Sequence, residues 1–214
     1  VRRFSANAPT AKQATSRVKL IEKLKPEDMK PSSRQYPWIR FDYDEKQKLH
    51  RQAVEIENLA FTYEGGERKI FNNLTLTINA GERIAVIGEN GVGKTTLLKL
   101  LMGEVTPQFG TIKWAEKAYP GYYAQDHSTQ FAGTESLTEW IAGYARATIE
   151  DGGDLETLIR GTLGRLLFSG DEVKKSVNVI SGGEQGRMLF GKLMLSKHNV
   201  LLMDEPTNHL DMES

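Results

Sequence analysis

Apolar and polar residues alternate along several stretches of the chain, and this alternation predicts β-strands. Val54–Leu59 and Phe71–Ile78 place apolar residues largely at every second position, as strands with one buried face do. Gly110–Trp114 and Gly121–Gln125 are shorter runs in which we also expect strands. Trp38–Phe41, nearer the start, is a further candidate strand.

Two other runs are apolar almost throughout. Arg83–Ile87 and Val200–Met203 are short and rich in Val, Ile and Leu. Runs of this kind are typical of strands that are buried on both faces of a parallel sheet. We therefore expect both runs to form buried strands.

Helical spacing of apolar residues appears in three regions. Thr95–Met102 carries four leucines and has no internal Gly or Pro, so a helix is predicted there. The region from Thr134 to about Leu167 shows the same spacing, and the glycine pair at 152–153 breaks it into at least two helices. A further helix is expected after the glycine pair at 182–183.

The segment before the first of these helices matches the G-x-x-x-x-G-K-[ST] pattern of phosphate-binding loops without a mismatch. It comprises Gly88, Glu89, Asn90, Gly91, Val92, Gly93, Lys94 and Thr95. A strand, a glycine-rich turn and a helix in this order aim successive backbone N–H groups and a helix N-terminus at phosphate. Lys94 adds a positive charge for the β- and γ-phosphates, and the Thr95 hydroxyl can ligate Mg²⁺. The alternative is a chance glycine-rich turn, which the flanking strand and helix disfavour.

Two carboxylates, Asp204 and Glu205, directly follow the second apolar run. An aspartate at the end of an apolar strand, in the same domain as a phosphate loop, can hold Mg²⁺ through a water or through the Thr95 hydroxyl. Glu205 can orient or deprotonate the water that attacks the γ-phosphate. The alternative is that the two carboxylates merely end a strand.

A second anion site is predicted at Ser181, Gly182 and Gly183, where backbone N–H groups and a hydroxyl meet at a helix start. One nucleotide does not need two phosphate-binding sites in the same chain. We therefore expect the second site to bind a nucleotide that is held by a different domain. The alternative is an ordinary serine N-cap followed by glycines.

The net charge of zero over 214 residues conceals an asymmetry. Residues 1–51 hold 13 Lys and Arg against 6 Asp and Glu, whereas residues 52–214 hold 15 against 22. A basic arm on an acidic domain fits nucleic acid, an anionic membrane surface or an acidic protein partner. A helix is predicted from about Thr10 to Lys25, ended by Pro26, and a solvated helix without a partner is its alternative.

The absence of cysteine excludes disulfides and thiolate metal sites, and the four histidines show no metal-ligand spacing. No apolar run approaches the length of a membrane span, and the first residues lack an apolar signal core. The chain begins without Met and stops abruptly at Ser214, so we expect a piece of a longer protein.

The order and separations of four motifs resemble those of the ATP-binding-cassette (ABC) ATPases. The motifs are Gly88–Thr95, Ile180–Gln185, Val200–Glu205 and Asn208–Asp211, which match Walker A, the signature, Walker B and the D-loop of that superfamily. The resemblance implies an α/β fold of the P-loop NTPase type, with a mixed core sheet, flanking helices, an antiparallel β subdomain and a helical subdomain at about residues 126–180. It also implies ATP and Mg²⁺ as ligands.

The same resemblance assigns further residues to the nucleotide. Gln125 is implied to be the Q-loop glutamine that reaches the metal and the attacking water. Tyr63 is implied to stack on adenine, with Phe61 as the competitor and a core aromatic as the alternative reading. The expected catalytic residues are Glu205, Gln125 and Lys94, and the expected metal ligands are Thr95, Gln125 and Asp204. The residues expected to contact nucleotide are the whole phosphate loop, Thr96, Tyr63, Ser181, Gly182, Gly183, Glu184 and Asp211.

The segment Asp204–Ser214, together with Ser-Gly-Gly-Glu at 181–184, is similar to the ABC-F family, and the runs 4–17, 121–127 and 163–168 resemble one branch of it. Members have two ATPase domains in one chain and no transmembrane part, and they bind the ribosome near the tRNA exit site. The resemblance implies that residues 1–36 are a basic interdomain linker that contacts tRNA and ribosomal RNA. Residues 37–214 would then be the second ABC domain of a cytoplasmic protein, incomplete because its switch histidine lies beyond Ser214.

The implied function is ATP binding and hydrolysis in translation, in which the closed ATP-bound form binds the ribosome and hydrolysis releases it. The first ABC domain of the same protein would supply half of each nucleotide site, so we expect the chain alone to hydrolyse little ATP. Two alternatives stay open. A nucleotide-binding subunit of an ABC membrane transporter shares these motifs but should lack the basic arm. A nucleotide-gated RNA-binding module with little turnover is the other, and the intact Lys94 and Glu205 argue against it.

Overall fold

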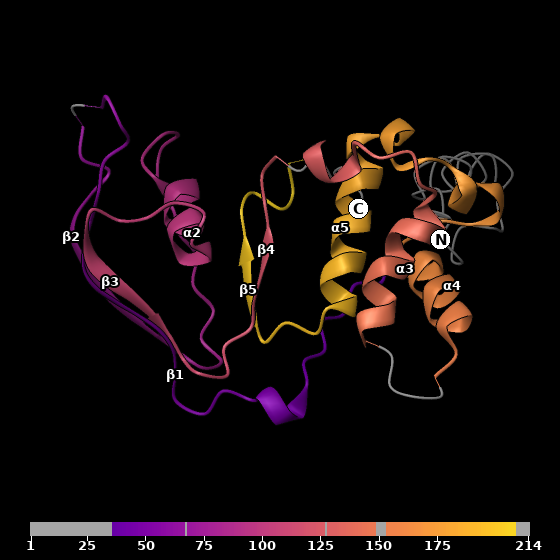
Figure 1. Ribbon diagram of the computed structural model, residues 1–214, viewed down its shortest axis with the longest axis horizontal. Coiled ribbons are helices and arrows are strands. Elements are labelled where there is room, and N and C mark those ends of the chain that lie inside the picture. Colours follow the sequence, from indigo (N-terminus) through magenta and orange to yellow (C-terminus); the bar gives the residue numbers. More distant parts are fainter. Residues whose placement is uncertain (1–35, 67, 127, 149–152, 209–214) are drawn as a thin grey trace, which may run out of the picture. The chain divides into compact units, whose positions relative to one another are not determined.

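The structure is a computed structural model that describes residues 36–208 apart from 67, 127 and 149–152 (Figure 1). All described residues belong to the unit that spans Tyr36–Ser214. The predicted helix from Thr10 to Lys25 and the basic arm around it lie outside the described residues. The elements are η2 Glu45–Gln47, β1 Gln52–Phe61, β2 Phe71–Asn79, α2 Lys94–Met102, β3 Phe109–Trp114, β4 Pro120–Tyr123, η3 Ser128–Phe131, α3 Leu137–Thr148, α4 Leu155–Arg165, η4 Gly170–Lys174, η5 Val177–Val179, α5 Gly182–Leu195 and β5 Val200–Met203.

An antiparallel sheet of three strands, in the order β2-β1-β3, forms the first layer. The central strand β1 pairs with both neighbours, so that Val54 lies opposite Ile78 on one side and Trp114 on the other. Its apolar side chains are buried, and leucines of α2 pack against them in one cluster. Helix α2 thereby lies along this sheet, as Figure 1 shows. The alternating pattern correctly predicted β1 and β2, and the shorter run correctly predicted β3.

A parallel pair of strands, β4 and β5, forms a second sheet. The register pairs Pro120 with Val200 and Tyr123 with Met203. Because parallel strands point the same way, the residues that follow β4 and β5 leave the sheet at the same edge. This register decides where the polar residues beyond the two strands meet.

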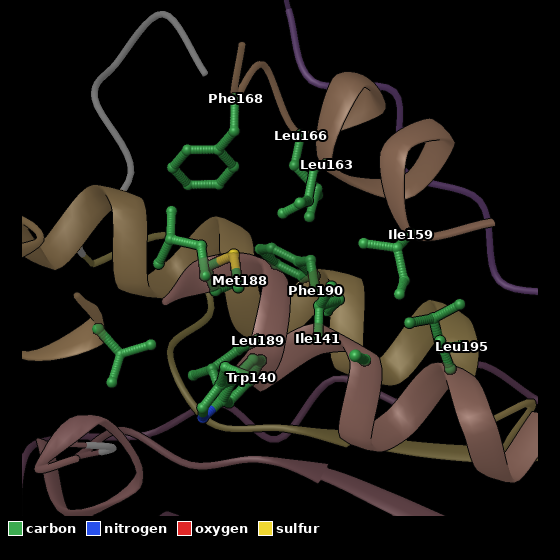
Figure 2. Packing of buried hydrophobic residues seen from close by; sticks show 14 of the residues in the cluster. Trp140, Ile141, Ile159, Leu163, Leu166, Phe168, Met188, Leu189, Phe190 and Leu195 are labelled. Atoms are coloured by element: carbon green, nitrogen blue, oxygen red, sulfur yellow. The ribbon is translucent and has the colours of Figure 1, made fainter. Parts of the chain in front are cut away.

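Helices α3, α4 and α5 share one apolar core with β4 (Figure 2). Figure 2 shows side chains of α4, such as Leu163, facing Ile141 of α3 and Met188 of α5. Phe190 of α5 stacks on Tyr123 of β4 with ring centroids 4.8 Å apart, which joins the helices to the parallel strands. The predicted break between two helices is confirmed, since α3 ends at Thr148 and α4 begins at Leu155.

Two predicted strands are wrong. Arg83–Ile87 carries no strand, and its side chains are exposed, with Ile84 at 50% and Ile87 at 90%. A strand needs a hydrogen-bonded neighbour, and no described strand pairs with this run. Trp38–Phe41 is not a strand either. The backbone N–H of Trp38 donates to the carbonyl oxygen of Arg165, at the end of α4, at 2.8 Å, so this segment contacts a helix and not a neighbouring strand.

An apolar groove lies between Arg83–Ile87 and the edge of β5 that pairs with no strand among the described residues. It has a volume of about 1080 Å³, and its lining includes Ile84 and Val86 on one side and Leu201 and Met203 on the other. Within the described ranges, no helix is both long and apolar enough to cross a membrane.

Candidate nucleotide-binding site

The phosphate loop leads into α2 with its residues exposed or half-buried. Lys94 donates hydrogen bonds from Nζ to the carbonyl oxygens of Gly88 and Glu89, each at 2.9 Å. These bonds hold the Lys94 side chain against the start of the loop, so its positive charge lies beside the backbone of Gly88 and Glu89. A phosphate oxygen in the loop would therefore meet a cation that is already in position.

Gly93 is the position of the loop that most requires glycine. It is the N-cap of α2 with φ of 115°, and a Cβ on it would lie 2.5 Å from Cγ2 of Ile70. Because Gly93 has no side chain to cap the helix, the first N–H groups of α2 remain uncapped. Uncapped N–H groups at a helix N-terminus are donors for an anion, as the sequence motif predicts.

The aromatic residue expected at the adenine is Tyr63, and its competitor was Phe61. Phe61 is buried in the β1 core, whereas the Tyr63 side chain is 45% exposed. The two rings meet edge to face, with centroids 4.9 Å apart. The Tyr63 hydroxyl lies 3.1 Å from the hydroxyl of Thr96 in α2, which ties the ring to the helix that carries the phosphate loop.

The carboxylate predicted to be catalytic, Glu205, and the predicted Q-loop glutamine, Gln125, are brought together by the parallel strands. Gln125 and Glu205 each stand two residues beyond the paired Tyr123 and Met203. Gln125 donates from Nε2 to Oε2 of Glu205 at 2.9 Å. Glu205 has φ of 47°, in the left-handed region that residues with a Cβ rarely adopt.

Asp204 is almost fully buried beside these residues, at 4% exposure. Its Oδ2 has no hydrogen-bond partner among the described residues. Burial, and then the nearby carboxylates of Asp204 and Glu104, raise the pKa of Tyr122. A buried carboxylate oxygen without a donor is costly, and a bound cation would offset that cost.

The expected metal ligands fit Mg²⁺ in chemical type. Thr95 offers a hydroxyl, Gln125 a carbonyl oxygen and Asp204 the buried carboxylate, and hard oxygen ligands are what Mg²⁺ takes. Thr95 and Gln125 line one cavity of about 600 Å³. Across the described ranges there is no cluster of three or more His, Cys, Asp and Glu, so any metal here would be held by mixed oxygen ligands rather than a carboxylate cage.

The helix start at which a second anion site was predicted, that of α5, is capped by its own residues, with Ser181 as the N-cap. Ser181 accepts a hydrogen bond from the Glu184 backbone N–H at 3.3 Å, and its own N–H donates to Oε2 of Glu184 at 2.7 Å. Lys175 donates to the other oxygen of Glu184 at 3.3 Å. Burial raises the pKa of Glu184, but the hydrogen bonds from Ser181 and Lys175 outweigh it, and the net pKa is lowered.

The structure joins some of the predicted residues and leaves others apart. Lys94, Asp204 and Glu205 line the apolar groove together, and Gln125 is bonded to Glu205. Within the described chain, none of residues 181–184 lines this groove or the cavity at Thr95. Asp211 lies outside the described residues.

One residue at the site was not assigned a role by the sequence, namely Asn208. Its Nδ2 donates to Oε2 of Glu205, and its backbone N–H donates to the Glu205 carbonyl oxygen at 3.1 Å. The signal available in the sequence was Glu-Pro-Thr-Asn at 205–208, because Pro at the second position favours a tight turn.

Comparison with known proteins identifies the family to which the chain belongs. Residues 71–208, from β2 through the phosphate loop to Asn208, match the family model described as ABC transporter. The chain belongs to the ABC transporter family. It is an ABC ATP-binding domain, and the α/β fold of the P-loop type that the motifs imply is confirmed. A solved structure of a metal-chelate type ABC transporter in an inward-facing conformation is similar to this domain, with a TM-score of 0.58 and 27% identity over 76% of this chain and 63% of that one.

Curated relatives of this ABC domain agree with the ABC-F resemblance. The protein YbiT of Escherichia coli O157:H7 is 53% identical over 214 residues, which is 100% of this chain and 39% of YbiT. ABC transporter F family member 5 of Arabidopsis thaliana is 35% identical over 217 residues, covering 100% of this chain and 30% of that protein. The chain therefore spans well under half the length of these relatives.

Proposed function

We propose that this ABC domain binds ATP with Mg²⁺ and hydrolyses it. The observation that carries the proposal is the hydrogen bond between Gln125 and Glu205, at 2.9 Å, in a site whose groove also includes Lys94. A general base, an amide that orients it and a cation for the phosphates are the parts that phosphoryl transfer to water requires.

Each residue has a defined task in that reaction. The loop N–H groups and Lys94 hold the β- and γ-phosphates, and Tyr63 presents its exposed ring to adenine. Glu205 accepts a proton from water while the water oxygen bonds to the γ-phosphorus and the bond to the β–γ bridging oxygen breaks. Mg²⁺, when bound by Thr95, Gln125 and Asp204, neutralises charge on the phosphate oxygens.

The domain is proposed to be the second cassette of a two-cassette protein. The separation of Ser181 from the groove supports this arrangement, because a phosphate held there would belong to another nucleotide. The apolar groove beside β5 supports the expectation that a further strand, beyond Ser214, completes the cassette and carries the switch histidine. Such a strand would pair with β5 and with Arg83–Ile87, whose apolar side chains would then be buried.

The biological role is proposed to be that of an ABC-F protein on the ribosome. The 53% identity with YbiT and the match with an Arabidopsis F family member support this role. Residues 1–51, with 13 Lys and Arg against 6 Asp and Glu, supply the positive charge that binding to tRNA and ribosomal RNA needs.

Ribosome sedimentation with ATP tests this role in the full-length protein. Glu205→Gln should be retained on ribosomes, because ATP-bound protein that cannot hydrolyse stays closed. Neutralising Arg2, Arg3, Arg17 and Lys19 together should weaken retention and reduce its salt dependence. The matched control neutralises four exposed cations of the cassette, Arg40, Lys113, Arg160 and Lys174, and should change retention little.

Absence of the Glu205→Gln variant from ribosomes at every salt concentration would refute the translation role. If the Glu205→Gln variant instead bound to membrane vesicles that contain a transporter partner, the transporter alternative would be favoured. Equal loss in the arm variant and the control variant would refute a specific role for the basic arm.

A further inference from the structure

Glu205 occupies a backbone conformation that residues with a side chain rarely adopt. Its φ of 47° lies in the left-handed region, where Cβ crowds the carbonyl oxygen that follows. Pro206 follows it, and the Asn208 N–H closes a turn on the Glu205 carbonyl at 3.1 Å. The turn therefore begins at the residue proposed as general base and ends at Asn208.

The side chain of Asn208 returns to the same glutamate. Its Nδ2 donates to Oε2 of Glu205, which also accepts the 2.9 Å bond from Gln125. Only the amide nitrogen can donate to a carboxylate, so chemistry fixes which end of each amide faces Glu205. Asn208 thus holds Glu205 at two points, the backbone carbonyl and the carboxylate.

Both amides use one of the two carboxylate oxygens. Oε2 accepts from Gln125 and Asn208, whereas Oε1 accepts no hydrogen bond from any residue that the structure describes. A carboxylate held in this way has one oxygen fixed and one available. The available oxygen is the one that can accept a proton from water.

We propose that Asn208 is a positioning residue for Glu205, which fixes Oε2 and thereby presents Oε1 to the attacking water. The proposal rests on the proposed ATP hydrolysis at this site. It assigns Asn208 no contact with nucleotide. Its loss should lower kcat and leave ATP affinity unchanged.

The test compares variants of the full-length protein by ATP turnover and by equilibrium binding of ATP. Glu205→Gln first defines the share of turnover that this site contributes. Asn208→Asp keeps the shape but removes the donor and places a second carboxylate against Glu205. A hydrogen bond to a charged group is lost, so about nine tenths or more of that share should disappear.

Three further measurements separate positioning from folding. ATP affinity and melting temperature should stay at the wild-type values in Asn208→Asp. Asn208→Gln, which keeps an amide donor on a longer arm, should restore part of the lost turnover. Thr207→Ala, an exposed neighbour in the same turn, should turn over ATP as the wild type does.

Wild-type turnover in Asn208→Asp, with turnover reduced in Glu205→Gln, would overturn the inference and leave the proposed function standing. Weakened ATP binding in Asn208→Asp would also overturn it, because Asn208 would then act on the nucleotide. Unchanged turnover in Glu205→Gln would overturn the proposed function, and the inference with it.

Discussion

The phenol oxygen of Tyr63 and the hydroxyl oxygen of Thr96 lie 3.1 Å apart. This contact crosses from the end of the antiparallel sheet to the helix that follows the phosphate loop. It holds an exposed aromatic ring next to the helix that follows the loop. The ring and the N–H groups predicted to bind phosphate are therefore connected through α2.

Tyr63→Ala should weaken ATP binding about five- to tenfold, because an aromatic stacking contact contributes roughly 1 kcal/mol beyond burial. Tyr63→Phe keeps the ring and loses only the bond to Thr96, so its effect should be smaller. Titration of a fluorescent ATP analogue measures both affinities. Wild-type affinity in Tyr63→Ala would show that the ring does not contact adenine.

Replacing Gly110 by Ala should destabilise the fold more than replacing Gly81 by Ala. Both have positive φ, 84° and 83°, but a Cβ on Gly110 would lie 2.4 Å from the Glu57 carbonyl oxygen, whereas Gly81 has nothing within 4 Å. Gly81→Ala should lower the free energy of unfolding by about 1 kcal/mol, the cost of the backbone conformation alone. Gly110→Ala should lower it by about 3 kcal/mol, because a steric clash is added.

Urea unfolding of the two glycine variants checks this difference. The comparison is matched, since φ is nearly the same at the two positions. Equal destabilisation would mean that β1 and β3 are not as close at Gly110 as the structure has them.

The cap of α5 should make stability depend on pH. Hydrogen bonds to Ser181 and Lys175 lower the pKa of Glu184 below its ordinary 4.5 in spite of burial. A lowered pKa in the folded state means that the carboxylate stabilises the fold above pH 4.5, and that this stabilisation is lost as pH falls through the folded-state pKa. Glu184→Gln keeps an acceptor for the Ser181 N–H but loses the charge, so it should cost about 0.5 kcal/mol near neutral pH.

The same substitution should cost much less well below pH 4.5, where the wild-type carboxylate is itself protonated. Urea unfolding of both proteins at the two pH values measures the difference. A cost that is the same at both pH values would show that the charge of Glu184 does not contribute to the cap.

The sequence predicted the parts of the site that depend on neighbours along the chain. The phosphate loop, α2 and the strand before Asp204 each follow from a local pattern. Arg83–Ile87 has an equally clear apolar pattern, but a strand also needs a hydrogen-bonded neighbour, and a neighbour is not a local property. The apolar pattern of Arg83–Ile87 is therefore compatible with a strand, but it does not supply the pairing partner that a strand requires.

Two details of the site could not be read from spacing alone. Phe61 and Tyr63 are two residues apart, so alternation puts them on the same face, and only the end of β1 at Phe61 separates a buried ring from an exposed one. The meeting of Gln125 with Glu205 depends on the register between β4 and β5, which pairs residues 80 positions apart. The role of Asn208 depends in turn on the left-handed conformation of Glu205.

The most direct test of the central claim, that this site binds and hydrolyses ATP, compares Lys94→Ala with Glu205→Gln in the full-length protein. ATP binding and ATP turnover are measured for each. We expect Lys94→Ala to lose at least about tenfold in ATP affinity at this site, the effect of removing a cation from the phosphates. Glu205→Gln should bind ATP as the wild type does and lose the turnover of this site. Wild-type turnover in Glu205→Gln, or wild-type affinity in Lys94→Ala, would contradict the claim.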